Sequence, residues 1–580
     1  MIKLLKYLGA YKKESVLGPL FKLLEASFEL FVPLVVAEII DKGIGGGDHG
    51  YVVKMCLVLV ALGVIGLICS VTAQYFAAKA AVGFATGVRR VLFEHIQRLS
   101  YSELDTVGTS TLITRMTSDM NQVQSGVNLT LRLLLRSPFV VFGAMIMSFT
   151  IDVKTALTFL VTIPLLSIVV FGIMLICIPL YKKVQNKLDA VLSTTRANLT
   201  GVRVIRAFCR EDEEINKFEQ QNEELTAAQK FVGRISALMN PVTYVIINFS
   251  IIVLIYIGAI RVEQGIITQG LVIALYNYMS QILVELIKLA SLIISVTKSV
   301  ACGNRIQAVL EIEPDMYSPE KLTVEKADSE YAVEFRHADL RYKNAGENSL
   351  TDINFAVKKG ETVGIIGGTG SGKTSLVSLI PRFYDAANGE VLVNGINVRD
   401  YPLEMLRDKI GVVPQKAVLF KGTIRENMQW GKSDATDDEI NSAIAVAQAS
   451  EVVAGKEGGL DYEIAQGGKN LSGGQRQRFT IARALVKKPE ILILDDSASA
   501  LDLATDAALR RAICNMPEQT TVFIVSQRAA SIQHSDKIIV LDDGKIVGIG
   551  KHDELLRNCE IYAEIYNSQF KQEDRGAKQK

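Results

Sequence analysis

The chain of 580 residues is longer than one ordinary hydrophobic core, so we expect two or more domains. Its 63 lysines and arginines nearly balance its 62 aspartates and glutamates, which excludes the basic field expected of a protein that binds nucleic acid. Its mean hydropathy of +0.24 is unusual for a soluble chain of this length, and the long apolar runs are confined to roughly the first three hundred residues. These features predict a multidomain membrane protein.

The seven cysteines stand singly along the chain. They form no C-x-x-C pair and lack the density of a disulfide-stapled fold. We therefore interpret all of them as reduced packing residues: Cys56, Cys69, Cys177, Cys209, Cys302, Cys514 and Cys559.

Six apolar segments of the front half are long enough to cross a bilayer as helices. Residues 1–13 precede them as a basic amphipathic segment without a signal-peptide core, and we expect this segment to lie along the membrane surface. Short links pair the spans, whereas polar stretches of about fifty to sixty residues, patterned as helices, follow the second and the fourth. The expected spans cover residues 16–40, 53–78, 134–151, 155–180, 242–261 and 268–299.

Most basic residues of the front half lie in the two polar stretches, and the positive-inside rule places both stretches and both termini in the cytoplasm. These residues are Arg89, Arg90, Arg98, Arg115, Lys182, Lys183, Lys187, Arg196, Arg203, Arg206 and Arg210. Helical hairpins of this length are explained by contact with a soluble domain. Their tips fall near residues 103–112 and 201–208, where a short helix can press on such a domain; capping of the helix bundle is the alternative role.

Three ionisable residues fall on one helical face of the first span: Lys22, Glu25 and Glu29. Ionisable groups at membrane depth usually face a cavity or one another. Glu25 and Glu29 therefore either line a polar cavity that attracts cationic cargo, or they pair with Lys22 or lie near the membrane interface. We favour the second interpretation. In the last span, a tyrosine-rich stripe either packs or contacts cargo; it contains Tyr276, Asn277, Tyr278 and Gln281.

A polar linker with two prolines, at residues 311–330, separates the expected membrane domain (1–310) from a stretch with the composition of a soluble α/β domain (331–572). Residues 573–580 are expected to form a polar tail. Short β-type runs recur in the α/β stretch, with helical patterns between several of them, at 332–335, 362–366, 411–413, 491–494, 521–525 and 537–541.

A glycine-rich turn follows the apolar run 363–366 and opens into an apolar helical pattern. Its sequence, from Gly367 to Thr374, matches G-x-x-x-x-G-K-T between a strand and a helix. Backbone N–H groups at the helix N-terminus can cradle phosphate, Lys373 can reach the outer phosphates, and the Thr374 hydroxyl can bind Mg²⁺. This phosphate loop predicts a nucleotide site.

The run 491–494 is fully apolar and delivers two aspartates at its C-terminal end, where α/β sheets place ligand-binding groups. We expect Asp495 to hold the hydration shell of Mg²⁺, as the acidic partner of a phosphate loop does. Asp496 follows it directly.

The sequence Leu471-Ser472-Gly473-Gly474-Gln475 lies between these two elements and precedes an amphipathic helix. Together with the phosphate loop and the Asp495 strand, it resembles the nucleotide-binding domain of ATP-binding cassette (ABC) transporters. With six spans ahead of the cassette, the whole chain resembles a half-size ABC exporter. The implied fold is an all-α six-helix transmembrane domain with long cytoplasmic helical extensions, followed by an α/β P-loop domain.

The resemblance implies functional residues at the matching positions. Tyr342 would stack on adenine, Gln415 would join Mg²⁺ to the membrane interface, and Asp502 would lie in the segment that crosses to the partner. The set implied for ATP is Tyr342, Gly367, Thr369, Gly370, Ser371, Gly372, Lys373, Thr374, Ser375, Gln415, Leu471, Ser472, Gly473, Gly474, Gln475 and Asp502. Mg²⁺ would be held by Thr374, Gln415 and Asp495.

The resemblance also implies a dimer in which each ATP lies between the phosphate loop of one subunit and the signature 471–475 of the other. Ser472 and Gly474 would donate hydrogen bonds to the far γ-phosphate. Closing the cassettes on ATP would turn the spans outward-facing, hydrolysis would reset them, and the hairpin tips would be the coupling helices. The chain would act as an ATP-hydrolysing translocase, embedded in the lipid bilayer of a cell membrane with its cassette in the cytoplasm.

The chain departs from the family pattern at two catalytic positions. The residue after the Mg²⁺ aspartate is usually the glutamate that orients the attacking water, and here it is Asp496; a carboxylate drawn back by about an ångström can cost about a hundredfold in rate. The switch histidine is replaced by Gln527, which cannot carry charge to the γ-phosphate. Gln466 also stands where the family commonly has glutamate ahead of the signature.

Two losses at one γ-phosphate are best explained together, and they predict a degenerate site that binds ATP tightly and hydrolyses it slowly. The intact signature can then complete a competent site whose base and histidine come from a second half-transporter, in a bacterial heterodimer that exports small amphipathic, drug-like molecules. The alternatives are a homodimer with two slow sites, a peptide or lipid exporter, an importer built on this fold, and a regulatory ATP-binding subunit without turnover of its own.

Overall fold

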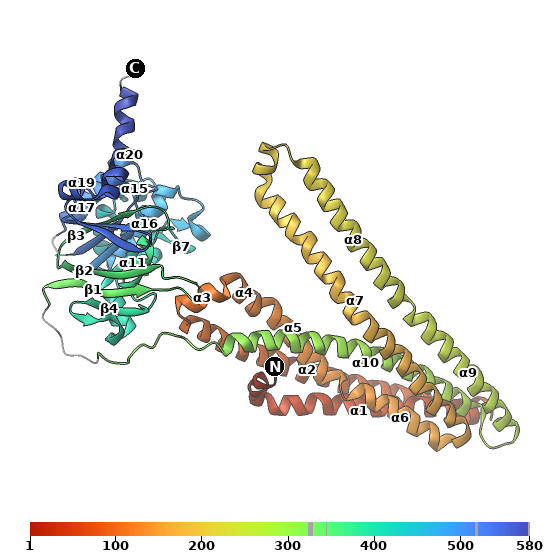
Figure 1. Cartoon of the computed structure of the whole chain (residues 1–580). Helices are drawn as coiled ribbons and strands as arrows, with labels where there is room; N and C mark the ends of the chain where they lie inside the picture. The colour runs from red at the N-terminus through yellow and green to blue at the C-terminus, as the bar shows by residue number, and fades with distance from the viewer. Residues whose placement is uncertain (323–328, 344, 517–519, 578–580) are drawn as a thin grey trace. The chain divides into compact units, whose positions relative to one another are not determined.

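The computed structural model describes residues 1–322, 329–343, 345–516 and 520–577. The chain divides into two compact units (Figure 1). The first contains Met1–Gln97 and Ser110–Ile312, and the second contains Arg98–Thr109 and Glu313–Lys580. The predicted linker lies partly outside the described residues, at 323–328. Because the segment 98–109 groups with the second unit, one of the two predicted hairpin tips belongs to the cassette side of the chain.

The first unit is all-α. An N-terminal 3₁₀ segment (Ile2–Tyr11) leads into α1, and the Met1 amino group donates a 2.7 Å hydrogen bond to Asn304 near the end of α10. The predicted position of residues 1–13 along the membrane surface stays a prediction. The helices of this unit, together with α3 of the second unit, are α1 (Lys12–Glu38), α2 (His49–Arg98), α3 (Tyr101–Val107), α4 (Thr109–Thr114), α5 (Met120–Leu133), α6 (Arg136–Ile151), α7 (Val153–Ala207), α8 (Glu211–Ala237), α9 (Met239–Glu263) and α10 (Gln269–Leu310).

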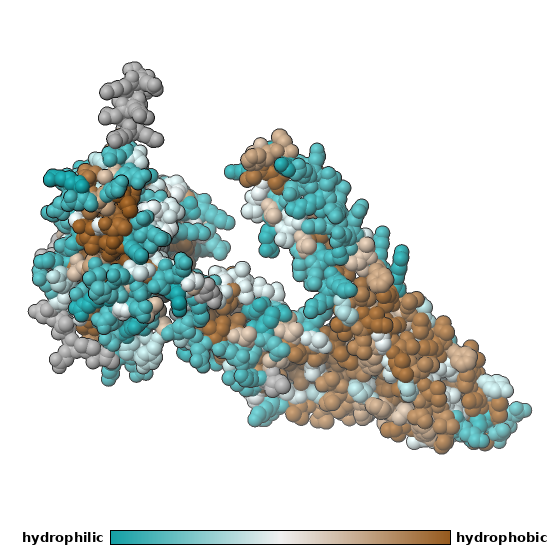
Figure 2. All heavy atoms as spheres, in the orientation of Figure 1, coloured by the Kyte–Doolittle hydropathy of each residue, from teal (hydrophilic) through white to brown (hydrophobic). Residues whose placement is uncertain are grey.

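Five helical segments among the described residues are long and apolar enough to cross a membrane, at the places predicted for the second to sixth spans. The first predicted span also forms a helix, α1, but Lys22, Glu25 and Glu29 lie in its centre and it does not reach the same apolarity. A sixth crossing at α1 therefore stays a prediction. Figure 2 shows hydrophobic side chains gathered over α6 and α9 and hydrophilic side chains over α8.

Helix α10 is the centre of the first unit and packs against α1, α5, α6, α7 and α9. The core that it shares with these helices contains Phe159, Leu166 and Ile282, none of which is exposed. At the crossing with α5, a Cβ atom on Gly126 would lie 2.0 Å from the Ser299 hydroxyl. Glycine is thus required for this close approach of the two helices.

Two aspartates hold the short links between spans. Asp152 ends α6 and caps α7, because its carboxylate accepts a 2.9 Å hydrogen bond from the Thr155 backbone N–H, and it also forms a 2.5 Å ion pair with Arg261 at the end of α9. Asp41 follows α1 and accepts a 2.8 Å hydrogen bond from the backbone N–H of Gly270 in α10.

The two hairpin tips differ. Short helices α3 and α4 form at the first tip, as predicted. At the second tip, α7 continues unbroken to Ala207 and turns directly into α8, so no separate short helix forms there. Leu199 and Phe208 at this tip are both 73% exposed. The sequence between 201 and 208 contains no proline, and the single Gly201 costs only about 1 kcal/mol in a helix, which is consistent with the helix continuing.

The second unit contains the predicted α/β domain, and all six predicted β-runs are strands. A six-stranded sheet has the order β12-β11-β3-β10-β9-β6 and is parallel except for β12, and an antiparallel sheet has the order β2-β1-β4-β5. The strands are β1 (Tyr331–Leu340), β2 (Leu350–Lys358), β3 (Thr362–Gly367), β4 (Asn388–Val393), β5 (Ile396–Asn397), β6 (Ile410–Val413), β7 (Gly422–Thr423), β8 (Glu463–Ile464), β9 (Ile491–Asp495), β10 (Thr521–Val525), β11 (Lys537–Asp542) and β12 (Lys545–Gly550).

The central strands are buried on both faces, which is why they read as continuous apolar runs. In β9, Leu492 and Leu494 pack into one core with the helices, while Ile491 and Ile493 pack into a second core with β1 and β2. The helices of this unit after the strand β3 are α11 (Lys373–Leu379), α12 (Leu403–Asp408), α13 (Ile424–Gln429), α14 (Asp437–Val446), α15 (Ser450–Ala454), α16 (Gly473–Val486), α17 (Leu503–Cys514), α18 (Ala529–Ile532), α19 (His552–Asn558) and α20 (Glu560–Ala577).

One expectation of the sequence needs correction, and another stays open. The predicted polar tail at 573–580 stays a prediction: α20 continues to Ala577, and residues 578–580 lie outside the described part. All seven cysteines are free, but Cys56, Cys209 and Cys514 are exposed and do not serve packing, unlike the four buried ones.

The double role of Asp152 gives a stability prediction. Asp152→Ala removes the cap of α7 and leaves the largely buried Arg261 unpaired, so we expect a loss of about 2–3 kcal/mol. Asp48→Ala is the matched control, because Asp48 caps α2 at Tyr51 without an ion pair, and it should cost about 1 kcal/mol. Thermal unfolding of the detergent-solubilised chain measures both. Equal losses in the two variants would contradict the role of the ion pair.

Candidate functional site

The phosphate loop joins the end of β3 to α11. Gly370 and Gly372 adopt left-handed φ angles of 85° and 92°, which glycine tolerates best. A Cβ atom on Gly367 would lie 2.1 Å from the Leu541 carbonyl oxygen, and one on Gly372 would lie 2.7 Å from the Leu350 side chain. These glycines let the loop turn tightly between β3 and the N-terminus of α11, which begins at Lys373.

Lys373 is folded onto the loop. Its ammonium donates hydrogen bonds to the carbonyl oxygens of Gly367 (3.0 Å) and Gly368 (2.6 Å). Burial lowers the pKa of Lys373 below its usual value, and the nearby Asp496 and Asp495 partly oppose this effect. The ammonium is thus a weakly solvated cation beside the loop, which favours exchange of its carbonyl partners for phosphate oxygens.

The Thr374 hydroxyl donates a 3.0 Å hydrogen bond to Asp495, which is 6% exposed at the end of β9. Burial raises the pKa of Asp495, and the hydrogen bond from Thr374 offsets part of this rise. A hydroxyl and a single carboxylate side by side are the protein ligands that Mg²⁺ uses when nucleotide phosphates complete its shell. The residues present therefore fit this ion, although the described residues contain no group of three acidic, cysteine or histidine side chains placed so that they could hold a metal ion by themselves.

A cavity of about 460 Å³ brings most of the predicted site residues together. Signature residues 471–475 and Asp502 do not line it, and neither do Gly367 and Ser371. The predicted residues that line the cavity are Tyr342, Thr369, Gly370, Gly372, Lys373, Thr374, Ser375, Gln415, Asp495, Asp496 and Gln527.

Six further lining residues were missed by the sequence analysis: Asn348, Ser349, Val525, Ser526, Asp543 and Gly544. Asp543 and Gly544 form the tight turn between β11 and β12, with positive φ angles of 44° and 73°. An Asp-Gly pair between two β-type runs is a recognisable hairpin signal, and this signal could have predicted the turn at Asp543 and Gly544. The others carry no local pattern that places them at a site.

Tyr342 lies at the cavity edge and connects it to α3. Its hydroxyl forms a 2.8 Å hydrogen bond with Ser375, and its ring lies edge-on to Tyr384 at 5.0 Å. The Tyr384 hydroxyl donates a 2.6 Å hydrogen bond to Asp105 of α3, and burial raises the pKa of this tyrosine. The first hairpin tip is therefore linked to the cavity through two tyrosine side chains.

Asp496 points its carboxylate toward Gln415, whose amide donates a long 3.4 Å hydrogen bond to it. Gln527 lies on the neighbouring segment after β10, and its side chain is exposed. Gln569 of α20 holds this segment, because its amide donates to the Gln527 carbonyl (2.7 Å) and accepts from the Ala529 N–H (2.8 Å). No local sequence pattern predicts this contact with the C-terminal helix.

The signature forms the start of α16. Ser472 caps this helix by accepting a 3.3 Å hydrogen bond from the Gln475 N–H, and the Ser472 N–H donates a 3.1 Å hydrogen bond to the side-chain oxygen of Gln475. Ser472 and Gly473 are exposed, so they can meet a ligand from outside the chain. Asp502 caps α17, and hydrogen bonds from Thr505 lower the pKa of this carboxyl. Gln466 is exposed in a short turn before the signature.

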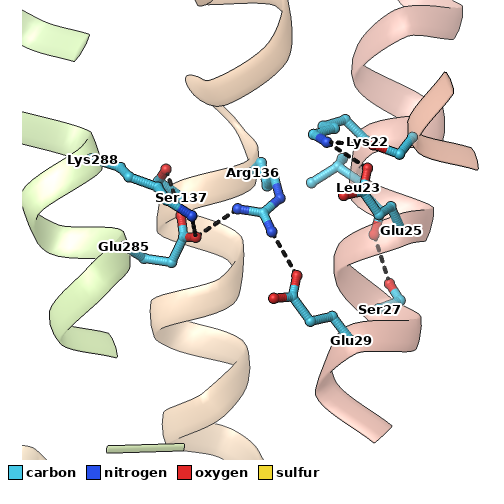
Figure 3. A network of polar contacts seen from close by, with 10 residues as sticks. Lys22, Leu23, Glu25, Ser27, Glu29, Arg136, Ser137, Glu285 and Lys288 are labelled. Atoms are coloured by element: carbon cyan, nitrogen blue, oxygen red, sulfur yellow. Dashed lines mark hydrogen bonds and ion pairs between the residues drawn. The ribbon is translucent and has the colours of Figure 1, made fainter. Parts of the chain in front are cut away.

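The acidic residues of α1 are paired, as favoured, but only Glu25 has the expected partner. Glu25 forms a 2.5 Å ion pair with Lys22, whereas Glu29 pairs with Arg136 of α6 (Figure 3). Tyr278, one of the possible cargo contacts, is fully buried and donates its hydroxyl to the Leu30 carbonyl. Tyr278 therefore packs between helices, while Tyr276 is 43% exposed.

The lysine of the phosphate loop gives the first prediction for this site. Lys373→Ala removes the cation that lies against the loop, and ATP affinity should fall by at least about tenfold because a charge-assisted contact is lost. Lys421→Ala, on a lysine outside the cavity, is the control. Titration with a fluorescent ATP analogue measures both, and unchanged affinity in Lys373→Ala would show that the cavity does not bind phosphate.

The link to α3 gives a second prediction. Tyr384→Phe removes the hydrogen bond to Asp105, which should cost about 1 kcal/mol and lower the hydrogen-exchange protection of residues 101–107 by about fivefold. Tyr317→Phe, at a 76% exposed tyrosine, should leave this protection unchanged. Hydrogen exchange followed by mass spectrometry measures both variants. Equal exchange in the two would mean that ring packing alone holds α3.

Comparisons with known proteins agree with this geometry. The family model described as the ABC transporter transmembrane region matches residues 15–286, and the model described as ABC transporter matches residues 350–499. The uncharacterised ABC transporter ATP-binding protein YfiB of Bacillus subtilis is 36% identical over 573 residues, which are 99% of each chain.

Two further relatives carry functional names. The putative multidrug export ATP-binding/permease protein YgaD of Bacillus subtilis is 31% identical over 98% of this chain and 99% of its own. The ATP-dependent lipid A-core flippase of Desulfotalea psychrophila is 33% identical over 83% of this chain and 84% of its own.

Among solved structures, a bacterial Atm1-family ABC exporter with ATP bound has the same fold. It superimposes with a TM-score of 0.78 at 22% identity and covers 96% of this chain and 98% of its own. The matched family models, the identities over nearly the full length and the shared fold lead to one conclusion: the chain belongs to the ABC transporter family, as a half-size transporter subunit whose membrane domain is fused to a cytoplasmic, ATP-hydrolysing cassette.

Proposed function

We propose that this chain is one subunit of a heterodimeric bacterial exporter and that its own ATP site is degenerate. A half-transporter acts as a dimer, with itself or with another chain. The observation that carries the proposal is the position of Asp496, one methylene short of the glutamate expected in the family, at the cavity that holds the phosphate loop.

The backbone around Asp496 supports slow hydrolysis. Its N–H donates a 3.0 Å hydrogen bond to the Val525 carbonyl, and its own carbonyl accepts a 2.8 Å hydrogen bond from the Ser499 hydroxyl. The residue also adopts a left-handed φ of 43°. Because both backbone groups are held, the chain is restrained from moving forward to compensate for the shorter side chain, and a misplaced base slows water attack.

Gln527 supports the same conclusion at the switch position. A neutral amide can donate one hydrogen bond to a γ-phosphate, but it brings no positive charge to the transition state. The backbone of its segment is tied to α20 through Gln569 and to β3 through the Ser526 N–H, which donates to Ile365. The site can therefore bind and orient ATP while lacking both groups that accelerate hydrolysis.

In this proposal, Tyr342 stacks on adenine, the phosphate loop and Lys373 hold the phosphates, and Thr374, Asp495 and Gln415 hold Mg²⁺. Bound Mg²⁺ neutralises charge on the β- and γ-phosphates. The exposed Ser472 and the neighbouring Gly474 serve the site of the second subunit, where that subunit supplies the phosphate loop, glutamate and histidine. Closure of the two cassettes moves the spans through the coupling tips.

The cargo that we propose is a small amphipathic, drug-like molecule exported from the cytoplasm. The name of the YgaD relative points to multidrug export, and the name of the flippase relative points to a lipid. A lipid or peptide exporter, an importer on this fold, and a regulatory subunit without turnover therefore remain the competing functions. Purified transporter in vesicles, offered dyes, peptides and labelled lipids in parallel, separates the cargo classes.

The heterodimer predicts an asymmetric response to mutation. Its second subunit is a half-transporter with glutamate and histidine at the positions of Asp496 and Gln527. Asp496→Asn should change the ATPase rate of the pair by less than about threefold, while the equivalent change in the second subunit should lower it by at least about a hundredfold, since only that site holds the general base.

The chain alone provides the control. Without the second subunit it should bind ATP but hydrolyse it slowly, and Asp496→Glu combined with Gln527→His should raise the rate. Brisk ATP hydrolysis and cargo transport by the unmodified chain alone would identify a homodimer. Loss of the pair's turnover in Asp496→Asn, with little effect of the change in the second subunit, would likewise overturn the degenerate site.

A further inference from the structure

An ionic network crosses three helices of the membrane domain (Figure 3). Arg136 of α6 forms ion pairs with Glu29 of α1 (2.5 Å) and with Glu285 of α10 (2.6 Å). Ser137 donates a 2.9 Å hydrogen bond to Glu285, and Lys288 forms a 2.9 Å ion pair with the same carboxylate. The network thus joins the three helices within the membrane domain, where charged side chains are costly unless they are paired.

The two acids of this network are in different situations. The side chain of Glu285 is only 2% exposed, and three donors satisfy its carboxylate. Glu29 has one contact, to the Arg136 guanidinium that Glu285 also binds, and its side chain is 40% exposed. Glu29 is therefore the acid of the network that can accept a further cation without any other pair being broken.

The direction of Glu29 on α1 shows where this exposed carboxylate lies. At about 100° per residue, Glu29 falls on the same side of the helix as the buried Lys22, Ala26 and Pro33. The large exposed apolar residues of α1 lie roughly on the opposite side; they are Val16, Leu20, Leu24 and Phe31. Because the apolar side suits lipid, the exposed part of Glu29 faces the interior of the membrane domain.

From this geometry we infer that Glu29 binds the positive charge of amphipathic cations, which are then the cargo class of the exporter. The assignment rests on the export function proposed above and narrows it. The cation would pair with the exposed side of the Glu29 carboxylate, while Arg136 stays fixed by Glu285. The lipophilic part of the cation would lie among the apolar side chains of the helices. The ion pair would favour positively charged molecules over neutral molecules of similar shape.

Glu25 offers a control within the same helix. It lies one turn before Glu29, but its carboxylate is paired with the buried Lys22, whose ammonium also donates to Ser70. The side chain of Glu25 is 17% exposed, less than half the value for Glu29. A cation would have to displace Lys22 to reach it, so Glu25 should not contribute to binding.

Binding of tetraphenylphosphonium, a lipophilic cation, to the purified full chain in nanodiscs tests the inference directly. Glu29→Gln should weaken its affinity by about tenfold, the effect of losing one partly exposed ion pair in an apolar setting, and Glu29→Asp should restore part of it. Glu25→Gln should change the affinity for the cation by no more than about twofold. Glu29→Gln should likewise change the affinity for the neutral triphenylphosphine oxide by no more than about twofold.

Three results would overturn the inference: no saturable binding of the cation to the unmodified chain, equal weakening for the cation and the neutral compound in Glu29→Gln, or equal weakening in Glu25→Gln. The melting temperature of Glu29→Gln shows whether the variant merely loosens the helix packing. Glu29→Asp is the second control, because it shortens the side chain but keeps the negative charge. Binding is measured without ATP or transport. If export were not found, a charge-selective binding result would still support the role of Glu29. If binding were not charge-selective, the proposed export function would not be affected.

Discussion

The alignment of parallel strands in the cassette is the constraint on which the ATP site depends. Strand β10 pairs with β3 on one side and with β9 on the other, so that Ile365, Val525 and Asp495 lie in one row across the sheet. The phosphate loop, the aspartate pair and the segment of Gln527 follow these strands, and they therefore meet at one edge. A shift of one residue in either pairing would separate the aspartates from the loop.

This alignment also explains why the departures from the family pattern matter together. Asp496 and Gln527 belong to adjacent strand ends, and the Asp496 N–H is bonded to the last residue of β10. The backbone at both positions is held by hydrogen bonds to neighbouring segments. The same backbone restraint that assembles the site around the phosphate loop thus keeps the shorter carboxylate and the uncharged amide in place, and it is the physical argument for the slow hydrolysis that we propose.

A different constraint acts in the membrane domain, where charged side chains have little access to water and are costly unless they are paired. Buried charges are compensated by neighbours, on the same helix for Lys22 and Glu25 and on other helices for Arg136, which pairs with Glu29 and Glu285. The pairing joins α1, α6 and α10, and it leaves the carboxylate of Glu29 partly accessible. A charge arrangement that stabilises the helix packing can in this way also provide a binding position for an ion of the opposite sign.

Local sequence determined the elements whose signals are contained in a short stretch. The phosphate loop, the apolar strands and five of the spans follow from glycine positions, continuous apolar runs and span length, because these properties act within a few residues. The antiparallel strands β2, β4 and β12 were missed. In β2, buried apolar residues alternate with polar ones, so no continuous apolar run marks the strand.

Only the tertiary structure decided which distant residues meet. Three contacts join residues that are far apart in the chain. They are the ion pair of Glu29 with Arg136, the hydrogen bond of Tyr384 to Asp105, and the hydrogen bond of Gln569 to the Gln527 carbonyl. Helical periodicity placed Glu25 and Glu29 on one face, but it could not tell which partner each would find, because ion pairing depends on neighbouring helices rather than on spacing within one helix.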